Sequence, residues 1–256
     1  MESFNWDEVA LSSEIEYSKA LKSEPVEYPR FTHLYNPFVP WGGDFNRAVG
    51  VKITDFQSFE DITSQVESIH REKALERPGR FDIYPPVLKE NIWRNYLLDK
   101  GYRLSTALFF SAPPLEYTLP PEFTLENPSQ DEYIAWFCHI VQSRGYFEEE
   151  WFQKVKPLQL NFASIFKPYW LLRGSDLVGW VYCAALEGYA RLFEVEVVED
   201  YRGKGMGGLL LKAIRAEGKK MGVQSILLQS EESLRRFYEG AGFQECTRNT
   251  SIWSYG

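Results

Sequence analysis

The stretch LFEVEVVEDYRGKGMGGLLLKAIRAEGKKM, residues 192–221, joins an apolar, strand-like run to a helix-like run through a loop rich in glycine. The eight positions from Tyr201 to Gly208 hold four glycines and two cations. The first amides of a helix have no partner within the helix, and the helix dipole adds partial positive charge there. A pyrophosphate at that end accepts hydrogen bonds from these amides, and glycines let the backbone approach it closely. The stretch therefore predicts a diphosphate site at the start of a helix.

Two other phosphate-binding patterns compete for the same loop. Gly203, Gly205 and Gly208 satisfy the G-x-G-x-x-G pattern of dinucleotide-binding proteins, and Glu231 follows at roughly the distance of that pattern's acidic residue. However, residues 199–202 separate the strand-like run from the first glycine, and the preceding chain resembles an antiparallel meander rather than βαβ units. The nicotinamide interpretation is therefore the weaker one. A Walker A loop needs Ser or Thr after its lysine, and here a glycine follows.

Composition narrows the class of protein. The formal net charge of −8 argues against a general nucleic-acid binder. No apolar run approaches the roughly 18 residues of a membrane span, and the acidic N-terminus does not resemble a secretory signal. Three scattered cysteines predict a reduced, cytoplasmic protein, and with three scattered histidines they give no ligand spacing for a metal.

The chain is expected to have two parts. Prolines cluster in the segment SAPPLEYTLPPEF, residues 111–123, and predict a boundary near residue 112, with domains at 1–112 and 113–256. Both parts follow the order strand, helix, short strand, helix, Gly-aromatic, strand, which suggests a pseudo-repeat. Only the second part has the glycine loop. The expected fold is α/β, with a mixed central sheet flanked by helices.

Local signals predict several element boundaries. Ser58, with Asp61 three positions later, resembles a capping box that opens a helix. Asn127 and Pro128 are expected to start another helix that runs to about Arg144, and Ser230 to cap a later one. Two strands are expected around the turn at 174–176. Near the C-terminus, residues 242–246 and 250–255 are expected to form separate strands.

Two motifs in order give the chain a family resemblance. Residues 202–207, RGKGMG, resemble motif A of the GNAT superfamily of N-acetyltransferases, whose core pattern is [RQ]-x-x-G-x-[GA]. Residues 235–243, RRFYEGAGF, resemble the family's FYEKxGF segment. The resemblance covers roughly residue 115 to the end and implies a GNAT fold. The first part resembles two-domain members in which it is a smaller, degenerate GNAT-like half.

The resemblance implies direct acyl transfer from acetyl-CoA to a primary amine. In the family the motif A amides bind the CoA pyrophosphate, and the pantetheine arm pairs with the preceding strand. Carried to this chain, the cofactor-binding residues are Val195, Val197, Arg202, Gly203, Lys204, Gly205, Met206 and Gly207.

The catalytic groups follow partly from the resemblance and partly from the strand pattern. The family uses a tyrosine of the FYE segment to protonate the thiolate, which here is Tyr238. Glu194 and Glu196 alternate with two valines, so both carboxylates are expected on one face of the strand as candidate bases. Some members carry a glutamate where this chain has Gln229. Whether a side chain or a water chain removes the amine proton stays open.

The acceptor is expected to be an amine of a small molecule or a peptide. The family places an acceptor pocket after the first strand, so residues 146–151 are a candidate wall, although aromatic residues in this region are also typical of core packing. A non-catalytic acyl-CoA-binding or regulatory module is the alternative function. Nothing in the sequence indicates the oligomeric state.

Overall fold

The computed structural model describes residues 4–40, 45–75, 79–83, 90–143, 145 and 149–254. The chain divides into two compact units. Unit 1 comprises Met1–Phe109 and Glu245–Gly256, and unit 2 comprises Phe110–Gln244. The domain boundary expected near residue 112 stays a prediction, but the grouping of the C-terminal strand with unit 1 was not expected.

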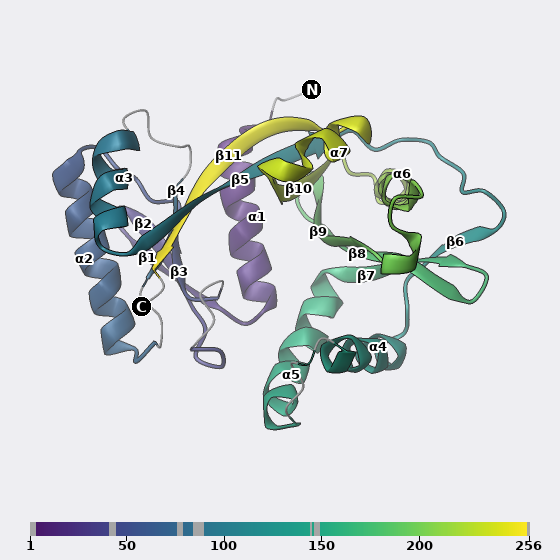
Figure 1. Ribbon diagram of the computed structural model, residues 1–256, viewed down its shortest axis with the longest axis horizontal. Coiled ribbons are helices and arrows are strands. Elements are labelled where there is room, and N and C mark those ends of the chain that lie inside the picture. Colours follow the sequence, from purple (N-terminus) through teal and green to yellow (C-terminus); the bar gives the residue numbers. More distant parts are fainter. Residues whose placement is uncertain are drawn as a thin grey trace. The chain divides into compact units, whose positions relative to one another are not determined.

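Unit 1 is built on a mixed sheet with three helices (Figure 1). The strands follow the order β1-β2-β3-β4-β11-β5, in which β3 and β4 are parallel and β4 pairs antiparallel with β11. Its elements are α1 (Trp6–Ala20), β1 (Glu24–Tyr28), β2 (Phe31–Tyr35), β3 (Arg47–Val49), α2 (Phe56–Glu72), β4 (Arg80–Ile83), α3 (Glu90–Asp99), β5 (Tyr102–Ala112) and β11 (Gln244–Ser254).

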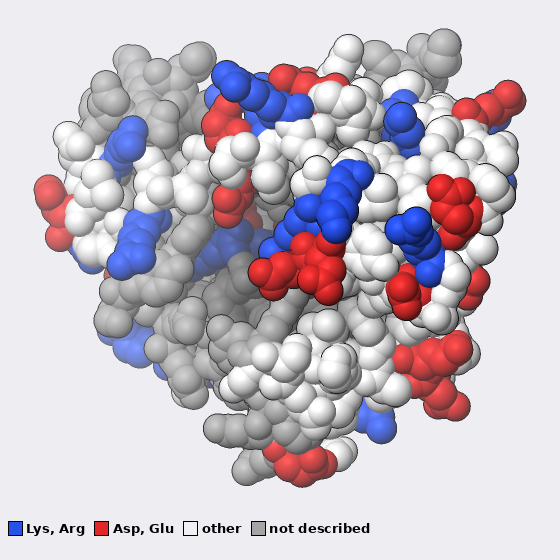
Figure 2. All heavy atoms as spheres, turned by 45° about the vertical axis from the view of Figure 1, so that its right-hand side comes forward, with Lys and Arg blue, Asp and Glu red and all other residues white. Residues whose placement is uncertain are grey.

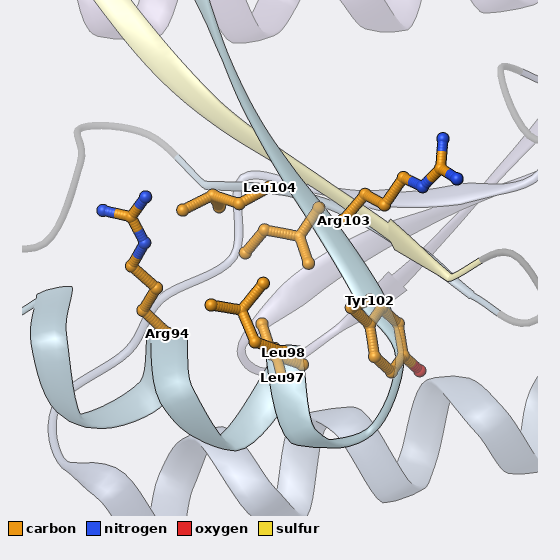
Figure 3. A pocket seen from close by; sticks show the side chains of 7 residues that line it. Arg94, Leu97, Leu98, Tyr102, Arg103 and Leu104 are labelled. Atoms are coloured by element: carbon orange, nitrogen blue, oxygen red, sulfur yellow. The ribbon is translucent and has the colours of Figure 1, made fainter.

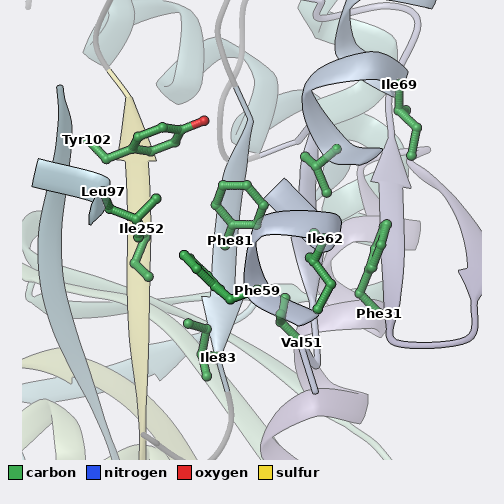
Figure 4. Packing of buried hydrophobic residues seen from close by; sticks show 12 residues of the cluster. Phe31, Val51, Phe59, Ile62, Ile69, Phe81, Ile83, Leu97, Tyr102 and Ile252 are labelled. Atoms are coloured by element: carbon green, nitrogen blue, oxygen red, sulfur yellow. The ribbon is translucent and has the colours of Figure 1, made fainter. Parts of the chain in front are cut away.

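The core of unit 1 forms where α2 packs on the sheet (Figure 4). Phe59 and Ile62 of α2 are fully buried with Phe81 and Ile83 of β4 and Ile252 of β11. Residues three and four apart on a helix share one face, so Phe59 and Ile62 reach the same core.

The start of α2 differs from the prediction. The N-cap is Asp55, whose carboxylate accepts from the Ser58 amide at 2.7 Å, while the Ser58 hydroxyl accepts from the Asp55 amide at 3.1 Å. Ser58 is therefore the N3 residue that ends the capping box rather than the N-cap that opens it. Asp61 instead accepts a side-chain bond from Gln57 on the helix surface.

A buried histidine pair in unit 1 predicts a pH dependence of stability. His33 of β2 and His70 of α2 are buried, with their Nε2 atoms 3.1 Å apart. Burial, the neighbouring His70 and the charge of Lys73 lower the pKa of His33 to about 3. Between its ordinary pKa and that value only the unfolded chain binds the proton, so lowering the pH should destabilise the fold. The free energy of unfolding should fall by up to about 1.4 kcal/mol per pH unit below about pH 6.5.

Urea unfolding midpoints between pH 8 and pH 5 measure this slope. A His33→Gln variant should show a shallower slope over the same range, because glutamine does not titrate. Parallel slopes for the two proteins would contradict the assignment.

Unit 2 comprises the helices α4, α5, α6 and α7 and two short 3-10 turns, packed around the strands β6 to β10. The strands follow the order β5-β10-β9-β8-β7-β6, and the pair β9 and β10 is parallel. Its elements are β6 (Phe123–Glu126), α4 (Gln130–Ser143), α5 (Glu149–Ile165), β7 (Lys167–Arg173), β8 (Asp176–Ala185), β9 (Tyr189–Val197), η1 (Glu199–Tyr201), α6 (Met206–Lys220), β10 (Ser225–Glu231), η2 (Glu232–Leu234) and α7 (Arg235–Gly240).

Helices cover both faces of this sheet. Figure 1 shows α6 on one side of β7 to β9 and α4 with α5 on the other. Phe162 of α5 packs against Tyr182 and Phe193, with ring centroids 5.1 and 6.0 Å apart. On α6, an added Cβ at Gly218 would lie 2.4 Å from Ile226 Cδ1, so the helix approaches β10 closely.

The two units repeat one element order. The series β3-α2-β4-α3-β5 matches β9-α6-β10-α7-β11, as the pseudo-repeat predicted. β11, the last strand of the second series, belongs almost wholly to unit 1, where it pairs with β4. Residues 242–246 and 250–255, expected as separate strands, belong largely to the single strand β11.

Several boundaries in unit 2 also differ from the predictions. Helix α4 begins at Gln130, where Ser129 and Glu132 exchange hydrogen bonds, and Asn127 instead donates to the Pro168 carbonyl at 2.6 Å. Helix α5 was not predicted. Ser230 lies within β10 and is not a helix cap.

Candidate active site

The site begins at the end of β9, where the sheet opens. The ladder between β9 and β10 pairs residues 189–191 with residues 225–227, and the rest of both strands lies beyond it. On the other side of β9, Tyr182 of β8 is opposite Phe193, and Trp180 of β8 is opposite Glu196. Three steps along β9 therefore correspond to two along β8, which is a β-bulge.

The bulge changes where the two candidate carboxylates lie. Glu194 has a φ of +48°, in the left-handed region, and is exposed, whereas Glu196 is half-buried. The alternation that was expected to put both on one face does not hold through this segment. Gly179 on β8 makes the bulge possible, because a Cβ there would lie 2.5 Å from the Glu196 carbonyl oxygen.

The glycine loop leads from this bulge into α6. Gly203 and Gly205 have φ of +71° and +79°, and Gly205 is the N-cap of α6 without a side-chain cap. The Leu209 amide makes the first bond back to the Gly205 carbonyl at 3.1 Å. The amides of residues 206–208 precede that bond, so they are the helix-start donors that an anion can use.

Close packing, and not a positive φ, requires a glycine at position 207. A Cβ at this position would lie 2.9 Å from Cζ of Phe237 and 3.6 Å from Cγ2 of Val197. The start of α6 therefore lies directly against α7 and the end of β9. The Phe237 ring remains 40% exposed beside it.

The two cations of the loop are held close to it. Arg202 donates from Nε to the Val197 carbonyl at 2.9 Å, and its Nη2 lies 3.4 Å from the Glu196 carboxylate. Lys204 donates to the Asp200 carbonyl at 2.8 Å. Both therefore add positive charge near the start of α6. Beyond the loop, Figure 2 shows acidic and basic side chains interspersed over one face of the molecule.

Tyr238 lies in α7, inside an aromatic cluster. It is 5% exposed, and its ring centroid is 5.0 to 6.1 Å from those of Phe110, Phe237 and Phe243. Burial raises the pKa of Tyr238, while a hydrogen bond with Ser230 and the charge of Arg191 act in the lowering direction. The net pKa is raised, so the phenol is protonated at neutral pH and is available as an acid.

In unit 1, the helix that corresponds to α6 is α2, and a carboxylate of the protein itself occupies its start. There, Asp55 occupies the N-terminal amides of α2 through the capping box, whereas α6 begins at a glycine with no side chain. The anion-binding arrangement is thus present at α6 and filled internally at α2.

A shallow depression in unit 1 offers no comparable chemistry (Figure 3). Leu97, Leu98 and Leu104 line it with Ile252, and Arg94 and Arg103 lie at its sides. Its tyrosine hydroxyl, Tyr102, donates to Glu67 at 2.9 Å.

The sequence missed three residues that shape the site. Gly179, Arg191 and Ser230 lie in strands β8, β9 and β10, and none belongs to a recognisable motif. Of the proposed acceptor wall, residues 146–148 lie outside the described residues, and Trp151 lies in α5. Gln229 is half-buried on β10.

Solved structures share this fold over almost the whole chain. A functionally unknown conserved protein from Staphylococcus epidermidis is 11% identical, with a TM-score of 0.73 over 91% of this chain and 94% of that one. A GCN5-related N-acetyltransferase from Kribbella flavida is 15% identical, with a TM-score of 0.68 over 97% and 96%. The fold is therefore the α/β fold of GNAT proteins.

Sequence comparison identifies the family of unit 2. Residues 167–245 match the family model described as the Acetyltransferase (GNAT) domain, so the chain contains a GNAT acetyltransferase domain. The [Ribosomal protein bS18]-alanine N-acetyltransferase of Haemophilus influenzae is 34% identical over 77 residues, which are 29% of this chain and 53% of that protein. The chain spans about half the length of the curated relatives it matches.

In the described part of the chain, each helix is too short or too polar to cross a membrane.

Proposed function

We propose that the protein transfers an acetyl group from acetyl-CoA directly to a primary amine. The observation that carries the proposal is the start of α6, where two glycines with positive φ lead into a helix that has no side-chain cap. This arrangement, inside a matched GNAT domain, is suited to the diphosphate of an acyl-CoA.

The proposed cofactor site extends from the end of β9 into α6. The amides of residues 202–207 take the pyrophosphate, and the charges of Arg202 and Lys204 add to the attraction. Val195 and Val197 lie beyond the β9–β10 ladder, where backbone groups of β9 are placed to pair with the pantetheine arm. A backbone amide in the same segment supplies the donor for the oxyanion of the tetrahedral intermediate.

The proposed acid is Tyr238, which gives its proton to the leaving thiolate. Of the two candidate bases, Glu194 is the better placed. It is exposed at the bulge, whereas Glu196 lies 3.4 Å from the Arg202 guanidinium, which stabilises its carboxylate as an ion-pair partner. A water held by Glu194 is an equivalent route for the amine proton.

The proposed acceptor is an amine of a small molecule or a peptide. The curated relative from Haemophilus influenzae is named as an N-acetyltransferase of alanine in ribosomal protein bS18, which makes a peptide α-amine one of the first to test. We further propose a cytoplasmic location, and that residues 1–112 are a degenerate GNAT-like half preceding the acetyltransferase domain.

Calorimetric titration of the full chain with acetyl-CoA tests the proposed binding site. We expect one molecule bound per chain, because Asp55 already fills the corresponding helix start of unit 1. We expect no binding of NADH. Two acetyl-CoA molecules per chain would contradict the role of Asp55, and binding of NADH without acetyl-CoA would overturn the proposal.

Release of free thiol from acetyl-CoA tests the transfer. The acceptors are a peptide with a free N-terminal alanine, a lysine peptide, spermidine and kanamycin. Thiol release that depends on one of these amines supports the enzyme. Binding of acetyl-CoA without release would favour the non-catalytic module.

A further inference from the structure

A buried arginine joins α6 to the end of α7. Arg215 of α6 is 8% exposed, and its Nη1 donates to the Ala241 carbonyl at 2.8 Å. Ala241 is the C-cap of α7, so its carbonyl lies at the partially negative end of that helix. The Nε of the same guanidinium donates to the Pro113 carbonyl at 3.0 Å. A charged side chain is rarely buried unless its polar atoms have partners, and here backbone carbonyls of two other segments provide them.

The two residues after Ala241 also lie against this guanidinium. Gly242 has a φ of +84°, and an added Cβ there would lie 2.9 Å from Nη1 of Arg215. The guanidinium carbon lies 5.6 Å from the centroid of the Phe243 ring. Arg215 therefore packs on each residue of the turn 241–243, and the glycine leaves the space that the guanidinium fills.

The same turn holds the backbone and one side of the ring of Tyr238. The amides of Ala241 and Phe243 both donate to the Tyr238 carbonyl at 3.0 Å. The centroid of the Phe243 ring lies 6.1 Å from that of Tyr238. A shift of this turn would therefore move the phenol with it.

Helix α6 also contacts α7 at its own start. An added Cβ at Gly207 would lie 2.9 Å from the ring of Phe237, the residue before Tyr238, and the amides beside Gly207 belong to the proposed diphosphate site. Gly207 and Arg215 are eight positions apart, which is about 12 Å along the helix. Helix α6 thus spans the distance between the diphosphate site and the turn that holds Tyr238.

From these contacts we propose that Arg215 is a positioning residue for acyl transfer. By holding the end of α7 against α6, it sets the place of the Tyr238 hydroxyl relative to a diphosphate bound at the start of α6. A general acid must lie within hydrogen-bond reach of the atom that it protonates, and a displacement of about 1 Å can cost about 100-fold in rate. The inference rests on the proposed acid role of Tyr238 and adds a residue from outside both motifs.

A double-mutant cycle separates this role from a general loss of stability. We expect Arg215→Met, which keeps an unbranched side chain but loses both hydrogen bonds, to lower kcat about 10-fold and to change the KM for acetyl-CoA by less than about 3-fold. In a Tyr238→Phe background the same substitution should have little further effect, because Arg215 acts through the phenol. An unchanged kcat in Arg215→Met, or an equal loss of kcat in both backgrounds, would overturn the proposal.

Lys219→Met is the matched control for this cycle. Lys219 is also a cation of α6, and it pairs with Glu116, on the segment that contains Pro113, rather than with α7. The control should keep its kcat. Arg215→Lys keeps a positive charge near the end of α7 and should recover part of the lost kcat. A control that loses as much kcat as Arg215→Met would assign the effect to the contact between α6 and that segment and would overturn the proposal.

Hydrogen exchange tests the contact without an acceptor. The amides of Ala241 and Phe243 should exchange about 10-fold faster in Arg215→Met, while those of residues 189–191 in β9 should keep their wild-type rates. Unchanged exchange at both amides would overturn the proposal.

Gly242→Ala is the second variant if Arg215→Met does not fold. Its methyl group would displace the guanidinium from the Ala241 carbonyl while Arg215 itself remains, so the same changes in kcat and in exchange are expected. Their absence would overturn the proposal in the same way. Unchanged turnover in Tyr238→Phe would instead show that the acid role itself is wrong, and faster exchange in the arginine variant would then describe a contact without a part in catalysis.

Discussion

Gly205→Asp should weaken acetyl-CoA binding by about 100-fold or more while the protein stays folded. Gly205 is the N-cap of α6 with a φ of +79°, and no side chain covers the amides that follow it. An aspartate there would place a carboxylate beside those amides and would repel a pyrophosphate. Hydrogen bonds to charged groups contribute about 1.5–3 kcal/mol, so losing one or two of them explains a change of this size.

Calorimetric titration with acetyl-CoA measures the effect, and Gly222→Asp provides a matched control. Gly222 has a φ of +75° with open space around it and lies just after the other end of α6, about 22 Å away for a helix of 15 residues. The control bears the same backbone strain and the same charge, so it should destabilise the fold similarly and leave the affinity intact. Equal affinities for Gly205→Asp and the wild type would remove the phosphate site from the start of α6.

The loop could be predicted from the sequence because its chemistry is local. A glycine with positive φ, a helix start and two cations all lie within a few positions of one another, from Arg202 to Gly208. The same holds for the FYE segment that carries Tyr238 and for the order of elements in the two halves. Nothing distant in the chain is needed to form these features.

The bulge could not be predicted, because it depends on two strands together. The pattern VEVV favours a regular strand with alternating faces, and the alternation fails only because Gly179 of β8 lets the Glu196 carbonyl approach within contact distance. A single strand pattern has no information about its neighbour. The grouping of β11 with unit 1 has the same cause, since its pairing with β4 joins residues more than a hundred positions apart in the chain.

Helix α5 shows packing overriding a local signal. Pro157 lies inside the helix, where a proline costs about 3 kcal/mol, and a proline in a sequence argues locally against a helix. The ring stacking of Phe162 with Phe166 and its contacts with Tyr182 and Phe193 offset that cost in the folded unit. Arg191 is a similar case, because an arginine in an apolar strand normally indicates a solvated face, yet here it is buried.

Tyr238→Phe should lower turnover by about 100-fold or more and change the affinity for acetyl-CoA by less than about 3-fold. General acid catalysis by a positioned side chain contributes roughly 10²- to 10⁴-fold, and phenylalanine removes the acidic proton alone. The ring contacts with Phe110, Phe237 and Phe243 do not involve the hydroxyl, so the cluster should keep its packing.

Thiol release with the best acceptor amine measures turnover, and Tyr169→Phe is the matched control. Tyr169 of β7 is 7% exposed, and burial raises its pKa to about 12, so its environment is comparable although it lies in a strand and Tyr238 in a helix. The control should keep nearly full turnover. A Tyr238→Phe protein as active as the control would make Tyr238 a packing residue, and the proton for the thiolate would then have to come from water. A protein that loses affinity and turnover together would instead place the hydroxyl in cosubstrate binding, because loss confined to kcat is what identifies a group that acts only in the transition state.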